Sequence, residues 1–229
     1  MFRMIKRLKK TIPVALPVML GYLAIGLPSG ILAAQVGVPA WACFVVSATV
    51  YSGAGQFMFP NMVLAGASPL AIIASISLVN TRQVLYSAAF APFFRKTSRL
   101  LTVVFSATVT DETFGINLDK LSRVGEDWTP QDALAINLES MFSWASANCI
   151  GALLGPLLAL PTEITSFAMT AIFICLLVGQ KMRIEAVLAL VVAVLGVAVC
   201  KLVGLGGLAV FLGALLGVIA GTVYGAVKS

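Results

Sequence analysis

The sequence predicts an all-α integral membrane protein, from its composition and from the continuity of its apolar runs. Hydrophobic residues make up 60% and charged residues 10% of the 229 residues, and the mean hydropathy is +1.03. Soluble domains carry roughly 25% charged residues. The apolar runs do not show the alternation of apolar and polar residues that is typical of membrane β-barrels. We therefore expect a single transmembrane domain over residues 1–229, surrounded by a lipid bilayer.

Eight apolar segments approach the roughly 20 residues that a helix needs to cross a bilayer. They cover residues 12–36, 39–66, 69–93, 100–118, 133–160, 164–180, 184–203 and 205–227. The predicted fold is a bundle of about seven to eight hydrophobic segments, some of them broken or re-entrant.

The first segment, 12–36, follows a basic stretch and contains a candidate break. Five of the fifteen cations lie in the first ten residues, which favours a cytoplasmic N-terminus. The net positive charge therefore does not indicate a nucleic-acid-binding protein. Pro28 lies between Gly26 and Gly30, removes a backbone donor and frees carbonyl groups at membrane depth. Pro28 and Gly30 are thus candidate substrate-binding residues in an unwound turn. Close packing of another helix against the glycines is the alternative.

The second segment carries a polar interruption at Tyr51–Phe57, where a spanning helix is normally uniformly apolar. Irregular backbone at membrane depth is tolerated only where protein or a water-filled cavity surrounds it, and in transporters such breaks mark the substrate site. An opened turn also presents backbone N–H groups at a half-helix N-terminus, which suits a carboxylate. A simple kink with a satisfied glutamine is the alternative. The candidate substrate-binding residues here are Ser52, Gly53, Gly55, Gln56 and Phe57.

The third and fourth segments place charges at membrane depth. Arg82 follows Asn80 in the third segment, and Asp111 and Glu112 are adjacent in the fourth. Because a charge at the bilayer centre is costly, Arg82 must face the protein interior or water and needs a partner. Asn80 and Arg82 join the substrate-binding candidates, and Asp111 and Glu112 are candidates for an ion pair or a proton carrier. The alternatives are that Arg82 reaches the interface and that the two carboxylates cap a surface helix.

The fifth segment carries Glu139, a second candidate proton carrier, on an otherwise apolar helix. The sequence contains no histidine, so histidine catalysis and a histidine relay are excluded within this chain. A carboxylate of raised pKa is then the natural proton carrier. The sequence has no metal-ligand cluster or catalytic motif, and we expect no metal, no cofactor and no enzymatic activity. The last three segments are predicted from their apolar runs alone.

The charges allow two topologies. If all eight segments cross, the turn with Lys181 is cytoplasmic, but the Arg95–Arg99 turn lies outside and breaks the positive-inside rule. A re-entrant hairpin in 39–66, folded at Gly53–Pro60, removes that conflict. A second non-crossing segment near Asp111 then keeps Lys181 inside.

A faint internal repeat relates units of about 12–93 and 133–227. Ile25–Gly30 resembles Ile150–Gly155, and Gly-Gln pairs close both units. A true repeat would place a binding site at the interface of the two units. A chance match in glycine-, alanine- and leucine-rich sequence is the alternative.

Three blocks in order resemble the large subunit of the AzlC/YgaZ family of branched-chain amino acid exporters. They are Ser52–Phe57, Leu78–Tyr86 and Thr110–Phe114, and the Gly-x-Pro-x-Gly of the first segment also fits. The resemblance covers most of the chain and is strongest from Gly21 to Ile116. It departs from the family where Gln83 replaces a frequent histidine and where Ser166 replaces a frequent aspartate.

The resemblance implies a proton-driven exporter of valine, leucine, isoleucine and sometimes methionine, in the cytoplasmic (inner) membrane of a prokaryote. It also implies a small AzlD-type membrane subunit as partner. Backbone N–H groups near Gly53–Gln56, with Arg82, would hold the substrate carboxylate. Asp111 or Glu112 would take the ammonium group, the proton, or both in turn, and side chains such as Phe57 would surround the isopropyl group. Because of the two departures, a transporter or channel for another small solute is the alternative.

Overall fold

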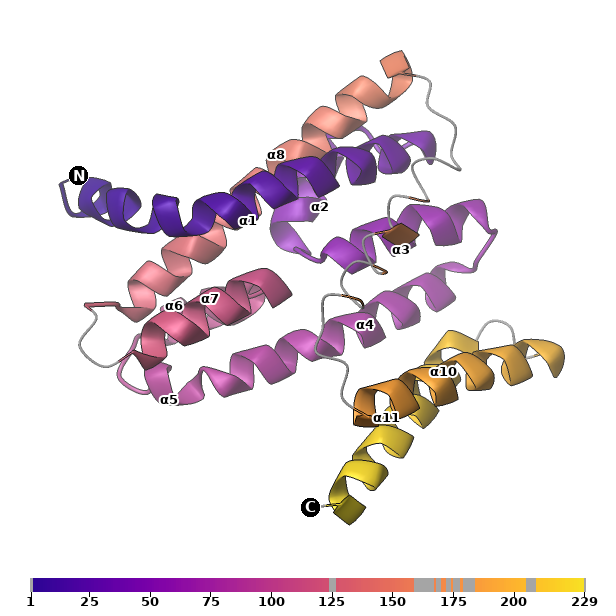
Figure 1. Cartoon of the computed structure of the whole chain (residues 1–229). Coiled ribbons are helices and arrows are strands. Elements are labelled where there is room, and N and C mark those ends of the chain that lie inside the picture. Colours follow the sequence, from indigo (N-terminus) through magenta and orange to yellow (C-terminus); the bar gives the residue numbers. More distant parts are fainter. Residues whose placement is uncertain are drawn as a thin grey trace. The chain divides into compact units, whose positions relative to one another are not determined.

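The computed structural model describes residues 2–123, 127–158, 184–204 and 209–228, together with residues 167, 170, 171, 174 and 178. The chain forms two compact units, Met1–Met169 and Thr170–Ser229. The elements in these ranges are the helices α1 (Phe2–Gln35), α2 (Ala40–Thr49), α3 (Gly53–Leu64), α4 (Pro69–Ala89), α5 (Ala91–Phe94), α6 (Arg99–Thr108), α7 (Asp111–Ser122), α8 (Pro130–Leu158), α10 (Ile184–Leu202) and α11 (Ala209–Lys228) (Figure 1).

The prediction of an all-α membrane protein is confirmed. Among the described residues, three helices are long and apolar enough to cross a bilayer: Ile5–Gln35, Pro130–Leu158 and Ile184–Leu202. Most of the predicted segment 164–180 lies outside the described residues, as do Ser166, Lys181 and the second Gly-Gln pair of the predicted repeat. The single domain and the repeat therefore stay predictions.

In unit 1, α1 and α8 lie side by side and run in the same direction (Figure 1). Arg7 near the start of α1 contacts Asp132 near the start of α8, with 3.0 Å between Nε and Oδ1. Further along both helices, the Ser143 hydroxyl donates to the Met19 carbonyl at 2.8 Å. α1 begins ten residues before the predicted segment, and the contacts of its basic residues with α8 account for that extension.

Glycines bring the backbones of α1 and α8 into direct contact. A Cβ added to Gly30 would lie 2.0 Å from the Asn148 carbonyl oxygen, and one added to Gly151 would lie 2.2 Å from the Leu27 carbonyl oxygen. α1 continues as one helix through Pro28, so the predicted unwound turn is wrong and the packing alternative holds. Membrane helices tolerate proline where neighbouring groups compensate for the lost hydrogen bond.

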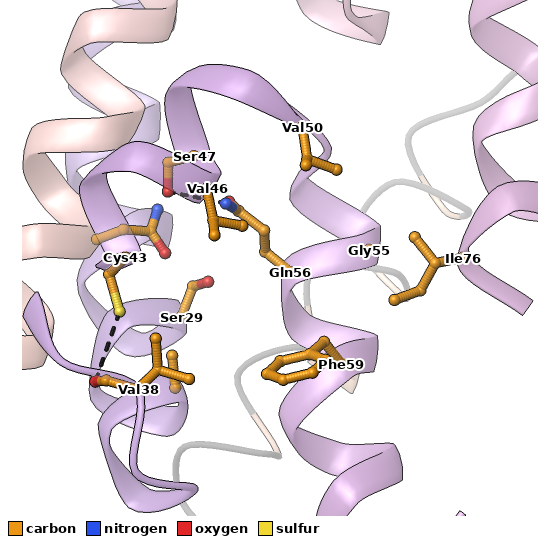
Figure 2. A pocket seen from close by; sticks show the side chains of 12 residues that line it. Ser29, Val38, Cys43, Val46, Ser47, Val50, Gly55, Gln56, Phe59 and Ile76 are labelled. Atoms are coloured by element: carbon orange, nitrogen blue, oxygen red, sulfur yellow. Dashed lines mark hydrogen bonds between the residues drawn. The ribbon is translucent and has the colours of Figure 1, made fainter. Parts of the chain in front are cut away.

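The predicted second segment is a hairpin of two short helices, the first hairpin (Ala40–Leu64). α2 has 10 residues and α3 has 12, and Figure 2 shows the chain turning back between them. The turn lies at 50–52, not at Gly53–Pro60 as predicted. The reason is local, since the Ser52 hydroxyl accepts from the Gly55 N–H at 3.1 Å and thereby starts α3 at Gly53.

The predicted fourth segment is also broken, as the second predicted topology requires with its non-crossing segment near Asp111. α6 has 10 residues and α7 has 12, with the break at Val109 and Thr110. Thr110 and Thr113 cap α7 reciprocally through side chain and backbone. We call Arg99–Ser122 the second hairpin. Each of its helices is about 15–18 Å long, half of the roughly 30 Å hydrocarbon core.

Several positive charges of unit 1 lie at one end. Asp132 binds both Arg7 and Lys10, at 3.0 and 2.8 Å. Ala133, the residue after Asp132, belongs to the same buried cluster as Phe94. Because the Arg95–Arg99 turn directly follows Phe94, this turn lies at the same end of unit 1 (Figure 1). We call it the basic end. The arrangement agrees with the second predicted topology, in which both broken segments return to the side from which they came.

Unit 2 contains α10 and α11, which match the predicted segments 184–203 and 205–227. The two helices pack through glycines: a Cβ on Gly217 would lie 2.4 Å from the Ala189 carbonyl oxygen. Gly204 follows α10 with a φ of +81°, a conformation that glycine adopts without strain.

Candidate functional site

The turns of the two hairpins meet beside the middle of α1 and the second half of α4. The Tyr22 hydroxyl lies 2.7 Å from the Thr110 hydroxyl of the second turn. The Tyr22 ring lies edge-on to Tyr51 of the first turn, with 6.3 Å between centroids. Gln83 of α4 donates to the Tyr51 carbonyl at 3.1 Å. α1 and α4 thus hold both breaks together at one place.

The charged residues of the third and fourth predicted segments lie together at this place. Arg82 Nη1 donates to Asp111 Oδ2 at 2.5 Å, and both side chains are about one-third exposed. Glu112 Oε2 accepts from the Tyr22 hydroxyl at 2.6 Å. Both carboxylates occupy the first turn of α7, where the helix dipole favours negative charge. Within the described residues, Glu112 contacts no cation.

Neutral hydrogen bonds hold the break of the first hairpin. The Ser52 hydroxyl donates to Asn80 Oδ1 at 2.5 Å while it caps α3. Asn80, Arg82 and Gln83 therefore lie within about one turn of α4 and reach both hairpins. Arg82 contacts the second hairpin, and the two amides contact the first. This explains why polar residues lie in the middle of an otherwise apolar helix.

Gln56 connects the first hairpin to α8. Its Nε2 donates to the Ser47 hydroxyl at 2.8 Å, and its Oε1 accepts from Trp144 Nε1. The Trp144 ring lies edge-on to Tyr22 at 5.4 Å. Gln56 and Glu112 are thus joined through two aromatic side chains.

The backbone of the first turn is less open than predicted. The N–H of Gly55 is bound by the Ser52 hydroxyl, and that of Gln56 by the Ser52 carbonyl at 2.9 Å. The N–H groups of Gly53 and Ala54 have no hydrogen-bond partner among the described residues. Two donors, rather than a whole opened turn, are available at this helix start.

A cavity of about 230 Å³ lies between the two helices of the first hairpin, α1 and α8 (Figure 2). We call it the hairpin cavity. Of the predicted substrate-binding residues, Gly55 and Gln56 line it. Phe57 is buried elsewhere in α3, and the cavity is lined by Phe59 instead.

The remaining candidates lie at other places. Pro28 and Gly30 belong to the α1–α8 contact, and Gly53 faces the Trp144 ring, with 3.6 Å to an added Cβ. Glu139 accepts from the Thr11 hydroxyl at 2.5 Å, on the side of the basic end. The structure therefore does not bring Glu139 to the hairpin turns.

Sequence reasoning missed five residues of this region: Tyr22, Ser29, Ser47, Trp144 and Asn148. Each is a tyrosine, serine, tryptophan or asparagine within a largely apolar helix, a pattern that ordinary packing also produces. Their role depends on contacts between α1, α2 and α8, and no local pattern reports those contacts.

The comparisons with known proteins agree with this geometry. A sequence model of the family described as AzlC protein matches residues 17–158, a range that contains both hairpins. An uncharacterized membrane protein of Helicobacter pylori is 32% identical over 80% of this chain and 79% of its own length. A Bacillus subtilis relative named branched-chain amino acid transport protein AzlC is 25% identical over 76% of this chain and 68% of its own length.

The Escherichia coli inner membrane protein YgaZ is 26% identical over 62% of this chain and 58% of its own length. No solved structure matches the chain significantly. The resemblance predicted from the sequence blocks is thus confirmed. This chain, a multi-pass helical membrane protein, belongs to the AzlC family.

Proposed function

We propose that this protein exports the branched-chain amino acids valine, leucine and isoleucine in exchange for protons, and that methionine is a further substrate. The observation that carries the proposal is the meeting of two broken hairpins at the Arg82–Asp111 pair. Broken helices at membrane depth are a feature of transporter binding sites. The name of the Bacillus subtilis relative supplies the substrate class.

Arg82 and Asp111 act as a latch between α4 and the second hairpin. The pair neutralises two charges that are costly at membrane depth when they stand alone. A zwitterion that passes the two hairpin turns during transport offers a carboxylate to Arg82 and an ammonium group to Asp111, and so it competes with the latch. Opening of the latch removes the ionic contact between the second hairpin and α4, and the contact of Tyr86 with Phe114 remains.

Glu112 carries the proton in this proposal. The sequence has no histidine, and among the described residues Glu112 has the Tyr22 hydroxyl, not a cation, as its partner. Protonation removes the charge of Glu112 and with it the strong charge-assisted bond from Tyr22. Tyr22 then keeps its contact with Thr110, so the state of Glu112 decides how α1 holds the second turn.

The basic end faces the cytoplasm in this proposal, which places the N-terminus inside. The protein resides in the cytoplasmic membrane of a prokaryote, as the printed name of the Escherichia coli relative suggests for that protein. It works with a small AzlD-type membrane subunit.

The test is counter-flow of labelled valine in proteoliposomes, with this chain alone and together with the small subunit. We expect exchange that leucine and isoleucine inhibit and that an imposed pH gradient drives. Arg82→Ala and Asp111→Asn should abolish exchange, whereas Arg123→Ala, which removes an exposed pair with Asp119, should retain it. Wild-type exchange by both latch variants would refute the role of the latch. Exchange of another solute but no valine would refute the substrate class.

A further inference from the structure

The hairpin cavity is not part of the latch, and its residues suggest a ligand. We propose that this cavity binds the whole transported amino acid, with the polar head at its deep end and the aliphatic side chain at its mouth. The inference rests on the proposed function and adds a site, separate from the latch, that holds the substrate in one orientation.

The cavity has the size of a small metabolite. Its volume of about 230 Å³ lies below the roughly 300–1,000 Å³ of pockets for drug-sized ligands. The same rule describes ligand pockets as mainly apolar with a few polar groups that fix orientation. The lining follows this description, and none of its residues is charged. A singly charged solute would therefore find no counter-charge, whereas an amino acid zwitterion is neutral overall.

Apolar side chains surround the mouth. Val46, Val50 and Phe59 are 43%, 50% and 38% exposed and line the cavity at the same time. Ile76 of α4 lies on the side of Gly55 (Figure 2). These four side chains form a wall of hydrocarbon that suits a valine or leucine side chain.

The deep end is polar. Ser29, Ser47 and Asn148 line it and are all at most 2% exposed. The Ser29 hydroxyl has no hydrogen-bond partner among the described residues, and Figure 2 shows it directed into the cavity. Buried hydroxyls are nearly always hydrogen-bonded, and a ligand atom in the cavity would satisfy this group. A lipid acyl chain offers none, whereas the carboxylate of an amino acid does.

The deep end is also connected to the proton carrier. Gln56 lines the cavity and accepts a hydrogen bond from Trp144. The Trp144 ring packs on Tyr22, and the Tyr22 hydroxyl donates to Glu112. A ligand that displaces the Gln56 amide from Ser47 or Trp144 therefore disturbs the residue that holds Glu112. Substrate binding and proton binding are coupled by this contact series in the proposal.

Ser29→Ala separates ligand binding from folding. The hydroxyl has no hydrogen-bond partner among the residues that the structure describes, so its removal should leave the melting temperature of the purified protein unchanged or slightly higher. The affinity for labelled valine, measured by equilibrium binding in lipid nanodiscs, should fall roughly tenfold, the value of one hydrogen bond. Unchanged valine affinity would contradict the predicted position of the head group.

Ile76→Ala and Val46→Phe test the mouth. Ile76→Ala enlarges the cavity and should raise the affinity for phenylalanine relative to valine, whereas Val46→Phe fills it and should abolish valine binding. Ile73→Ala is the matched control, since Ile73 is 63% exposed on the same helix and does not line the cavity. It should leave the phenylalanine-to-valine ratio at the wild-type value.

The outcomes distinguish this inference from the proposed function. If the wild type binds and exchanges valine and both mouth variants keep its selectivity, the cavity assignment fails and the function stands. If the wild type binds a different amino acid and the mouth variants change that preference, the cavity stands and the branched-chain substrate fails. Binding of no amino acid by the wild type, with lipid retained in the cavity, overturns the inference.

Discussion

The two hairpins have the same plan but different chemistry. Each has a 10-residue helix, a short break and a 12-residue helix, and a hydroxyl residue, Ser52 or Thr110, caps the second helix. The helices of the first hairpin contain no charged residue, whereas the second carries Asp111 and Glu112 at its turn. The difference shows that the same backbone arrangement can line an uncharged cavity in one hairpin and carry charged residues at the turn of the other.

The surroundings of the hairpins differ accordingly. The first hairpin packs on α8 and encloses a cavity. The second packs on a cluster of buried aromatic rings, in which Phe90 at the end of α4 lies 4.9 Å from Phe105 of α6. A hairpin packed on α4 and α5 in this way leaves room for a polar turn.

The largest expected effect is at Gly30, which packs on α8 beside the first hairpin, and the second hairpin offers Gly115 for comparison. Gly30→Ala places a Cβ 2.0 Å from the Asn148 carbonyl oxygen and so separates α1 from α8 beside the first hairpin. Overpacking typically costs about 1–3 kcal/mol, and we expect at least the upper value here because backbone must move. The measurement is the melting temperature in detergent, at equal protein level.

Gly115→Ala in the second hairpin is the matched control for that glycine. A Cβ there has nothing within 4 Å, so the better helix propensity of alanine should stabilise the protein by roughly 0.5–1 kcal/mol. Equal destabilisation by both substitutions would show that the α1–α8 contact is not special.

A smaller effect is expected from the latch. Arg82→Ala or Asp111→Ala leaves one charge without its partner, and we expect a loss of roughly 2 kcal/mol, between the values for surface and buried pairs. The variant that carries both substitutions should be more stable than the sum of the single losses predicts, because no lone charge remains. Strict additivity in this double-mutant cycle would mean that the two side chains do not interact.

The smallest effect concerns the caps that the hairpins share. Ser52→Ala removes the cap of α3 and Thr110→Ala that of α7, and each should reduce stability by about 1 kcal/mol. Thermal unfolding of both variants provides the comparison. Thr222→Val serves as control, because that hydroxyl bonds only to carbonyls of its own helix, Val218 among them. A loss for Ser52 alone would show that the two breaks are held by different means.

The sequence was sufficient to predict the family, the all-helical class and the charged residues that lie within apolar segments. Arg82 could be assigned a partner because an unpaired cation at membrane depth is so unfavourable that few carboxylates remain as candidates. The break in the first hairpin was visible in Ser52 and its glycines. The break before Asp111 was visible too, since the second topology needs a non-crossing segment there and Thr110 and Thr113 have the spacing of a helix cap.

The rest required tertiary contacts. Pro28 was expected to open α1, and only the tight packing of α8 explains why it does not. Phe59 rather than Phe57 lines the hairpin cavity, because Phe59 shares a face of α3 with Gly55 and Gln56, whereas Phe57 is buried on another face. Tyr22 and Trp144 connect elements more than eighty residues apart, and nothing in their own neighbourhoods marks them.

The parallel contact of α1 with α8 has a consequence for biosynthesis. The partner surface of Gly30 is encoded more than a hundred residues later, so a chain growing at ~5–20 residues/s leaves α1 without it for on the order of ten seconds. During this interval both hairpins are made, although each of their helices is too short to cross the membrane by itself. Emergence of α8 from the ribosome is therefore the event that completes unit 1. A chain that stalls before Gly151 exposes every earlier element to lipid or to quality control.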